Sequence, residues 1–175
     1  VNIRKKQHNI LSEVLDGLSY IRSLSVVFYA IISMLVIGTF AINTNVLIPV
    51  YAAEVLHTNA RGFSFLLSAM GLGSFTGSLV FAAYSKKNYG KKDITLYSSI
   101  FAVTLIAAGL SRNYILLLGI LAIVGFFQML FMITVNSTIQ LNTTDEYRGR
   151  AMSVYALVFA GTTPAGNFIT GLVTH

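Results

Sequence analysis

Long uncharged, apolar runs alternate with short charged clusters along this chain. No charged residue occurs within residues 23–53, 62–85, 94–111, 113–144 or 151–174. A helix needs about 20 apolar residues to cross the hydrocarbon layer, where its backbone polar groups must be satisfied internally. The pattern therefore predicts an all-α integral membrane protein with about five transmembrane helices. We place these helices at residues 25–53, 62–84, 94–110, 114–138 and 151–173.

The composition favours this membrane class over a soluble one. Of the 175 residues, 55% are hydrophobic and 10% are charged, whereas about a quarter of the residues in a soluble domain are charged. A soluble all-α protein of this size would have to bury several of its helices on every side. We therefore expect a polytopic helical bundle that has the lipid bilayer as its surroundings.

The net charge of +6 is a signal of topology rather than of nucleic-acid binding. Ten of the twelve cations fall in alternate gaps between the predicted spans: Arg4, Lys5, Lys6, Arg22, Lys86, Lys87, Lys91, Lys92, Arg148 and Arg150. The other gaps hold Arg61 and Arg112. Cytoplasmic loops of membrane proteins carry an excess of Lys and Arg. The N-terminus is therefore predicted to be cytoplasmic, and we expect no nucleic-acid partner.

The first residues predict an amphipathic helix ahead of the first span. In residues 10–22, Ile10, Val14, Leu18 and Ile21 share one helical face, which suits a helix lying at the membrane surface. We divide the chain into a cytoplasmic segment, 1–24, and a membrane part, 25–175. The sequence does not begin with Met, shows no secretory signal and ends directly after the last predicted span. We expect it to be a fragment of a larger membrane protein.

The second and fifth predicted spans are rich in small residues, which reduce the width of each helix. Gly73 and Gly77 are four residues apart, a spacing that lets another helix approach closely. That approach could serve static packing or a sliding interface. The second span contains "GSFTGSLV" at 73–80, and the fifth contains the similar "GNFITGLV" at 166–173. The match indicates a repeat of three spans, which is typical of secondary transporters.

The fifth span begins with charges and is then interrupted. Thr143 and Glu146 fit a capping box at its start. Pro164 removes a backbone donor, which predicts a kink that is either static or part of a motion. This narrow helix is expected to pack against another helix through Gly161, Pro164, Gly166 and Asn167.

Three stretches together resemble the C-terminal half of a major facilitator superfamily transporter, from about its seventh to its eleventh helix. The stretch 148–171, "RGRAMSVYALVFAGTTPAGNFITG", resembles the eleventh helix of the branch of multidrug, macrolide and enterobactin exporters. Residues 47–79 are similar to the seventh-to-eighth region of that branch. The turn "SKKNYGKKD" at 85–93 resembles the family's basic loop between the eighth and ninth helices, although Tyr84 and Ser85 stand where the family has Asp.

This resemblance implies a carrier of the bacterial inner membrane in which two six-helix lobes rock around a central site. The chain would supply most of the C-terminal lobe, and 1–24 would link it to a missing N-terminal lobe. Gly73, Gly77, Gly161, Pro164, Gly166 and Asn167 would pack at the interface between the lobes. A cytoplasmic gate would comprise Lys86, Lys87, Gly90, Lys91, Lys92, Asp145, Glu146, Arg148 and Arg150.

The fourth predicted span offers candidates for the substrate cavity. Gln128, Met132 and Asn136 recur every four residues, and amides that face lipid would be costly, so this face should point inward. Amide and thioether groups suit a permissive cavity for small amphipathic molecules, although the amides could instead bond between helices. In the first span, Asn43 is the fourth candidate.

No acid lies deep within any predicted span. The carboxylate that couples an exporter to protons would then lie in the missing lobe. We expect no enzyme, no metal and no cofactor, because no metal-binding, nucleophile-elbow or phosphate-loop motif occurs in the sequence. Two alternatives to an exporter remain: a non-transporting membrane scaffold or sensor, and the membrane subunit of another transport complex.

Overall fold

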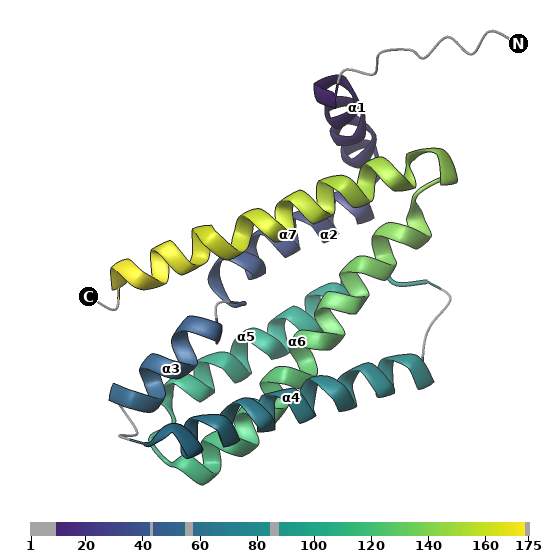
Figure 1. The fold of residues 1–175 in the computed structure, drawn as a ribbon. Helices are drawn as coiled ribbons and strands as arrows, with labels where there is room; N and C mark the ends of the chain where they lie inside the picture. Colours follow the sequence, from purple (N-terminus) through teal and green to yellow (C-terminus); the bar gives the residue numbers. More distant parts are fainter. Residues whose placement is uncertain (1–9, 43, 55–57, 85–87, 174–175) are drawn as a thin grey trace, which may run out of the picture.

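The fold is helical throughout the part of the chain described by the computed structural model, residues 10–42, 44–54, 58–84 and 88–173. These residues contain no strand, so the all-α prediction is confirmed. Seven helices follow one another: α1 (Ile10–Ser23), α2 (Ser25–Phe40), α3 (Thr44–Glu54), α4 (Ala60–Ala83), α5 (Lys91–Leu110), α6 (Tyr114–Asn142) and α7 (Asp145–Val173). Figure 1 shows α2 and α7 side by side above the group formed by α3, α4, α5 and α6.

Asparagine side chains cap the N-termini of two of the long helices. The Asn59 Oδ1 accepts a hydrogen bond from the Gly62 N–H (3.1 Å) at the start of α4. At the start of α6, the Asn113 Oδ1 accepts from the N–H groups of Ile115 and Leu116. These N–H groups have no partner within the helix, and Asn is a favoured residue to satisfy them. Polar turn residues thus define where the apolar helices start.

Three of the described helices, α4, α5 and α6, are long and apolar enough to cross a membrane. A fourth would be added if the end of α1 and α2, which meet at a bend of 112°, formed one span. The helix α7 is as long as α6, but its second half is diluted by Gly, Thr, Pro and Asn residues. Membrane placement of α3 and α7 stays a prediction.

The first predicted span, 25–53, is divided in the structure. The helix α2 ends at Phe40 and α3 begins at Thr44. Around the break, Thr and Asn side chains can bond to the local backbone in place of the helical ladder. Thr39 already does so, since its hydroxyl donates to the Leu35 carbonyl at 2.8 Å. Pro49 cannot donate a helical hydrogen bond within α3, which weakens the second half further.

The amphipathic segment expected at 10–22 is the helix α1, which departs sharply from the bundle (Figure 1). The turn falls at Leu24, whose backbone is extended with φ −99° and ψ 93°. The apolar Ile21 of α1 is nevertheless buried, and it belongs to the same core cluster as Val154 of α7. The helix α1 is therefore anchored to the bundle at its C-terminal end.

The helix α6 contributes to both buried clusters of the described residues. One cluster packs Phe131, Val135 and Ile139 of α6 with residues of α1, α2, α5 and α7. The other packs Leu121 and Val124 of α6 with residues of α3, α4 and α5. The helix α5 also has residues in both clusters, but α6 supplies more buried residues to each, so α6 is the central helix of the bundle.

Glycines bring α4 and α6 into backbone contact. A Cβ atom placed on Gly73 would overlap the Ala122 carbonyl oxygen, and one on Gly77 would lie 2.7 Å from the Phe126 carbonyl oxygen. Across the same interface, a Cβ on Gly125 would overlap the Met70 carbonyl oxygen. Small residues permit this approach between membrane helices, where packing drives association. The contact predicted from Gly73 and Gly77 is thus made within this chain.

Candidate functional site

The polar residues predicted to line a cavity lie along one face of α6. The Asn136 Oδ1 accepts a hydrogen bond from the Gln140 Nε2, and the Tyr155 side chain of α7 lies near Asn136. Met132, one turn away, is partly buried against the cluster that contains Phe131. The end of this face that holds Asn136 and Gln140 therefore lies near α7, and the Oδ1 acceptor of Asn136 is used within the chain.

Gln128 differs from Asn136 because its acceptor is unused. Its Oε1 is buried and accepts no hydrogen bond from the part of the chain that the structure describes. A buried polar atom without a partner costs free energy, typically about 1–3 kcal/mol. Such an atom is expected where a ligand or another element completes the hydrogen bond. Among the candidates on α6, Gln128 has the strongest structural support for a ligand contact.

Asn43, the fourth cavity candidate, lies outside the described residues. Its neighbour Thr44 is buried and borders a cavity of about 130 Å³ between α3, α4, α5 and α6. The lining is otherwise apolar apart from Tyr51, whose hydroxyl donates to the carbonyls of Gly109 and Ser111 at the end of α5. No pattern in the sequence indicated this cavity, because its walls come from four separate helices.

The residues predicted to pack between lobes have different surroundings. Gly73 and Gly77 are buried against α6. On α7, Gly166 is buried and Asn167 is partly exposed, whereas Gly161 and Pro164 are exposed and a Cβ atom on Gly161 would meet nothing within 4 Å. The helix continues through Pro164 to Val173. Their role at an interface with another lobe stays a prediction.

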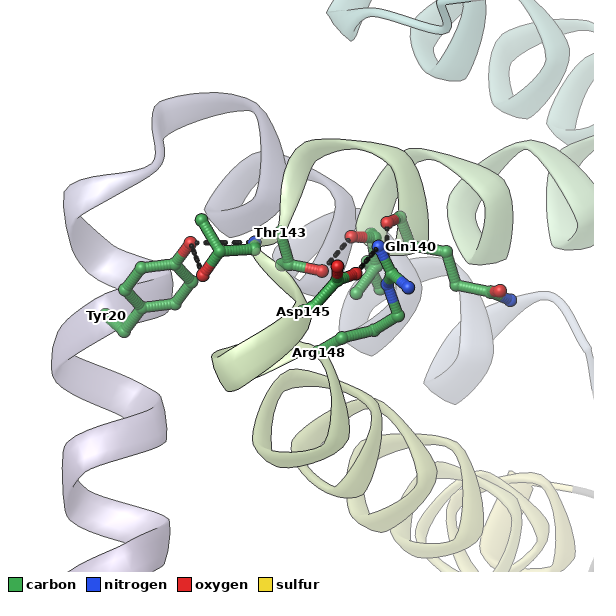
Figure 2. Close-up of polar contacts among 7 residues, drawn as sticks. Tyr20, Gln140, Thr143, Asp145 and Arg148 are labelled. Atoms are coloured by element: carbon green, nitrogen blue, oxygen red, sulfur yellow. Dashed lines mark hydrogen bonds and ion pairs between the residues drawn. The ribbon is translucent and has the colours of Figure 1, made fainter.

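At the predicted cytoplasmic end, the turn between α6 and α7 holds the acidic and basic residues (Figure 2). The helix α7 begins at Asp145, one residue later than the predicted capping box requires. The Thr144 carbonyl accepts from the N–H groups of Tyr147 and Arg148, so Thr144 precedes the helix. The Thr143 hydroxyl instead donates to the Ile139 carbonyl at 2.8 Å. The predicted capping box of Thr143 and Glu146 is therefore wrong, since Thr143 serves the end of α6.

Arg148 connects the start of α7 to the end of α6 (Figure 2). Its guanidinium lies 2.6 Å from a carboxylate oxygen of Asp145, and its Nε donates to the Gln140 carbonyl at 3.3 Å. The last carbonyls of a helix lack intrahelical partners, and a cation suits that negative end of the helix dipole. Glu146 is exposed. Arg150 lies with its guanidinium carbon 5.3 Å from the ring centroid of Tyr147.

Tyr20 of α1 completes this predicted cytoplasmic cluster, which comprises Tyr20, Thr144, Asp145, Tyr147 and Arg148. Its hydroxyl accepts a hydrogen bond from the Thr144 N–H (3.1 Å) and lies 3.2 Å from the Thr144 hydroxyl (Figure 2). Its ring stacks on that of Tyr147, with centroids 4.2 Å apart. Beneath it, a Cβ on Gly17 would lie 3.3 Å from the Arg150 Cβ. Sequence analysis missed Tyr20, because nothing in its local pattern relates it to a turn near residue 144.

The remaining predicted gate residues that the structure describes lie at the start of α5. The Gly90 N–H donates to the Asp93 Oδ2 at 3.1 Å, which begins the helix. The Lys91 ammonium lies 5.9 Å from the ring centroid of Tyr29 in α2, and Lys92 is exposed. Lys86 and Lys87 lie outside the described residues. The described residues contain no cluster of three or more His, Asp or Glu side chains that could hold a metal.

Helices of this length and apolarity, arranged around a buried central helix, define a polytopic membrane protein. A family model described as transmembrane secretion effector, MFS_3, matches residues 2–175. The chain therefore belongs to this family of major facilitator proteins, and it is a multi-pass membrane protein of the transporter class. Comparisons with curated proteins and with solved structures each returned no match. The family resemblance is confirmed at this level, while the multidrug and enterobactin exporter branch stays a prediction.

Proposed function

We propose that this chain forms one lobe of a proton-driven exporter of small amphipathic compounds that works by alternating access. The proposal places it in the bacterial inner membrane, with its N-terminal segment in the cytoplasm. The other half of the substrate cavity would come from an N-terminal lobe of the same polypeptide. Family membership supports a transporter or secretion effector. The export direction, the substrates and the proton coupling are the proposal.

The observation that carries the cavity assignment is the buried, unpartnered Oε1 of Gln128. An apolar compound with one hydrogen-bond donor would satisfy this atom while its hydrocarbon part contacts neighbouring side chains such as Met132. Soft thioether groups adapt to ligands of different shape. A lone acceptor within an adaptable apolar wall suits a carrier with broad specificity, because few polar groups have to be matched.

The cytoplasmic cluster supports the gating part of the proposal. Tyr20 connects α1 to Thr144 in the turn between α6 and α7, and Arg148 connects the start of α7 to the end of α6. These contacts are exposed, and exposed polar contacts are individually weak. A gate must break and form its contacts repeatedly, which several weak contacts allow more readily than a buried pair does.

The cavity assignment is tested by efflux from cells that express the full-length natural polypeptide. We compare Gln128→Leu with the control Asn142→Leu, which removes an exposed amide from the same helix. Retention of a panel of fluorescent amphipathic compounds should rise severalfold for Gln128→Leu and stay near wild type for Asn142→Leu. Equal retention in both variants would contradict the assignment of Gln128 to the substrate cavity.

The coupling and the two-lobe arrangement need separate measurements. A protonophore should abolish efflux, whereas dependence on a sodium gradient would contradict proton coupling. An antibody against residues 86–93 should detect a native polypeptide about twice as large as the 19.0 kDa chain. A native band at the size of this chain, together with no efflux of any compound, would favour the scaffold or sensor instead.

A further inference from the structure

Two shallow grooves adjoin each other where the first turns of α2 and α5 lie side by side. One groove has a volume of about 510 Å³ and the other about 380 Å³. They share Tyr29 of α2 and Lys91 of α5. The Tyr29 hydroxyl lies 2.6 Å from the Thr95 hydroxyl, and this hydrogen bond joins the two helices at the floor of the grooves.

The cytoplasmic end of the grooves is cationic. Arg22 lines one groove, Lys92 lines the other, and Lys91 lines both. No acid of the described residues lines either groove. All three cations are exposed, and none forms an ion pair with another described residue. The Ser25 hydroxyl lies among them, whereas the Thr95 hydroxyl donates to the Lys91 carbonyl. This end therefore offers positive charge and hydrogen-bond donors to an anion.

The other end of the grooves is mainly apolar, with Ser99 as its polar residue. Phe28, Ile32 and Leu96 line it, with exposed fractions of 44%, 40% and 54%. From Ser25 to Ile32 the chain advances seven residues along α2, which corresponds to about 10 Å of helix. The polar end and the apolar end are thus separated along α2, as the headgroup and the start of the acyl chains are separated along a phospholipid.

We propose that these grooves bind one anionic phospholipid from the cytoplasmic leaflet. Arg22, Lys91 and Lys92 hold its phosphodiester, and Phe28, Ile32 and Leu96 contact the first part of an acyl chain. The inference rests on the proposed orientation of the N-terminal segment, but it needs no transport activity. Charge complementarity selects this occupant, because basic groups at the cytoplasmic surface attract anionic lipids. A free anion would contact the cationic end alone and leave the apolar end uncovered.

The test is native mass spectrometry of the purified chain in detergent, with dioleoylphosphatidylglycerol and dioleoylphosphatidylcholine as probes. These lipids share their acyl chains and differ in headgroup charge. The wild type should bind one phosphatidylglycerol in preference to phosphatidylcholine. In Lys91→Gln/Lys92→Gln, binding of phosphatidylglycerol should weaken about tenfold or more, because each surface cation contributes appreciably to such attraction. Lys91→Arg/Lys92→Arg should retain it.

The matched control is Arg61→Gln/Arg112→Gln, which removes the same charge from two exposed cations at the opposite end of the bundle. It should leave phosphatidylglycerol binding within about twofold of wild type. An equal loss in the control would show attraction to net charge alone and would overturn the site. Release of the lipid by excess inorganic phosphate would overturn it as well, since the groove would then bind a free anion. If the double lysine variant does not fold, Arg22→Gln alone should show a smaller loss in the same direction, and undiminished preference would contradict the proposal.

Because lipid binding is measured on this chain without any substrate, the two proposals fail separately. Lost efflux with intact phosphatidylglycerol preference would refute the exporter and leave the lipid site. Intact efflux without headgroup preference would do the reverse.

Discussion

The hydroxyl of Tyr20 accepts a hydrogen bond from the backbone N–H of Thr144, 3.1 Å away, although 124 residues separate the two in sequence. The contact ties the end of α1 to the residue that precedes α7. The same tyrosine stacks on Tyr147 in the first turn of α7. The first helix and the start of the last one are therefore held together, and a displacement of one is transmitted to the other.

Removing the Tyr20 hydroxyl should loosen α1 without unfolding the bundle. We expect Tyr20→Phe, which keeps the ring stacking, to raise amide hydrogen exchange in α1 severalfold and to leave α4 and α6 unchanged. Tyr20→Ala should have a larger effect, because it removes both the hydrogen bond and the stacked ring. Exchange measured by mass spectrometry on the purified chain checks both. Identical exchange in wild type and Tyr20→Ala would show that the contact does not hold α1.

The backbone contact between α4 and α6 predicts a clear difference among glycines. Gly73→Ala should destabilise the protein by about 1–3 kcal/mol, since its Cβ atom would overlap the Ala122 carbonyl and force the helices apart. Gly71→Ala, two residues away on the same helix, should be neutral or stabilising. A Cβ there meets nothing within 4 Å, and Ala is the better helix former. Thermal unfolding in detergent measures both, and equal melting temperatures would contradict the close approach.

We expect Gln128→Leu to be more stable than the wild type although it transports less. Replacing the buried, unpartnered acceptor with an apolar group should stabilise the chain by about 1 kcal/mol. Asn136→Leu should destabilise it, because that side chain loses its hydrogen bond from Gln140. Unfolding in detergent compares the two variants. A destabilised Gln128→Leu would mean that the glutamine has a partner in the free protein.

The ion pair of Asp145 and Arg148 should contribute little by itself. Asp145 is 89% exposed, and an exposed ion pair contributes about 0–1 kcal/mol. We therefore expect Asp145→Asn to change stability no more than Glu146→Gln, which removes a neighbouring exposed carboxylate. Arg148→Gln should cost more than either, because it also loses the hydrogen bond to the Gln140 carbonyl. The ranking of melting temperatures at low salt tests this order, and a large effect of Asp145→Asn would reverse it.

Charge-free apolar runs predicted the helices well, because a helix is the favoured way to satisfy the backbone in lipid. The structure divides the first run after Phe40, where polar residues such as Thr39 and Thr44 interrupt an otherwise apolar pattern. Hydropathy averaged over a long window does not register such a local competition for hydrogen bonds. The spacing of Gly73 and Gly77 correctly indicated a close helix contact, and the structure supplies α6 as the partner.

The candidate site was predicted less completely. Periodicity found Gln128 and Asn136 on one face, because polar groups every four residues stand out in an apolar helix. It did not distinguish them, since the difference depends on the partner of each acceptor: the Asn136 Oδ1 accepts from Gln140, whereas the Gln128 Oε1 has no partner among the described residues. Tyr20 and the grooves between α2 and α5 depend on contacts across distant parts of the chain, and such contacts leave no local signature.

The glycine contact between α4 and α6 also restricts how the protein can move. Sliding between packed helices normally proceeds by small changes of side-chain rotamers at the interface. Where carbonyl groups face the Cα atoms of Gly73 and Gly125 directly, no rotamer is available to absorb a shift. The helices α4 and α6 therefore move as one rigid body. A hinge of this protein has to lie outside this pair rather than at the interface between the two helices.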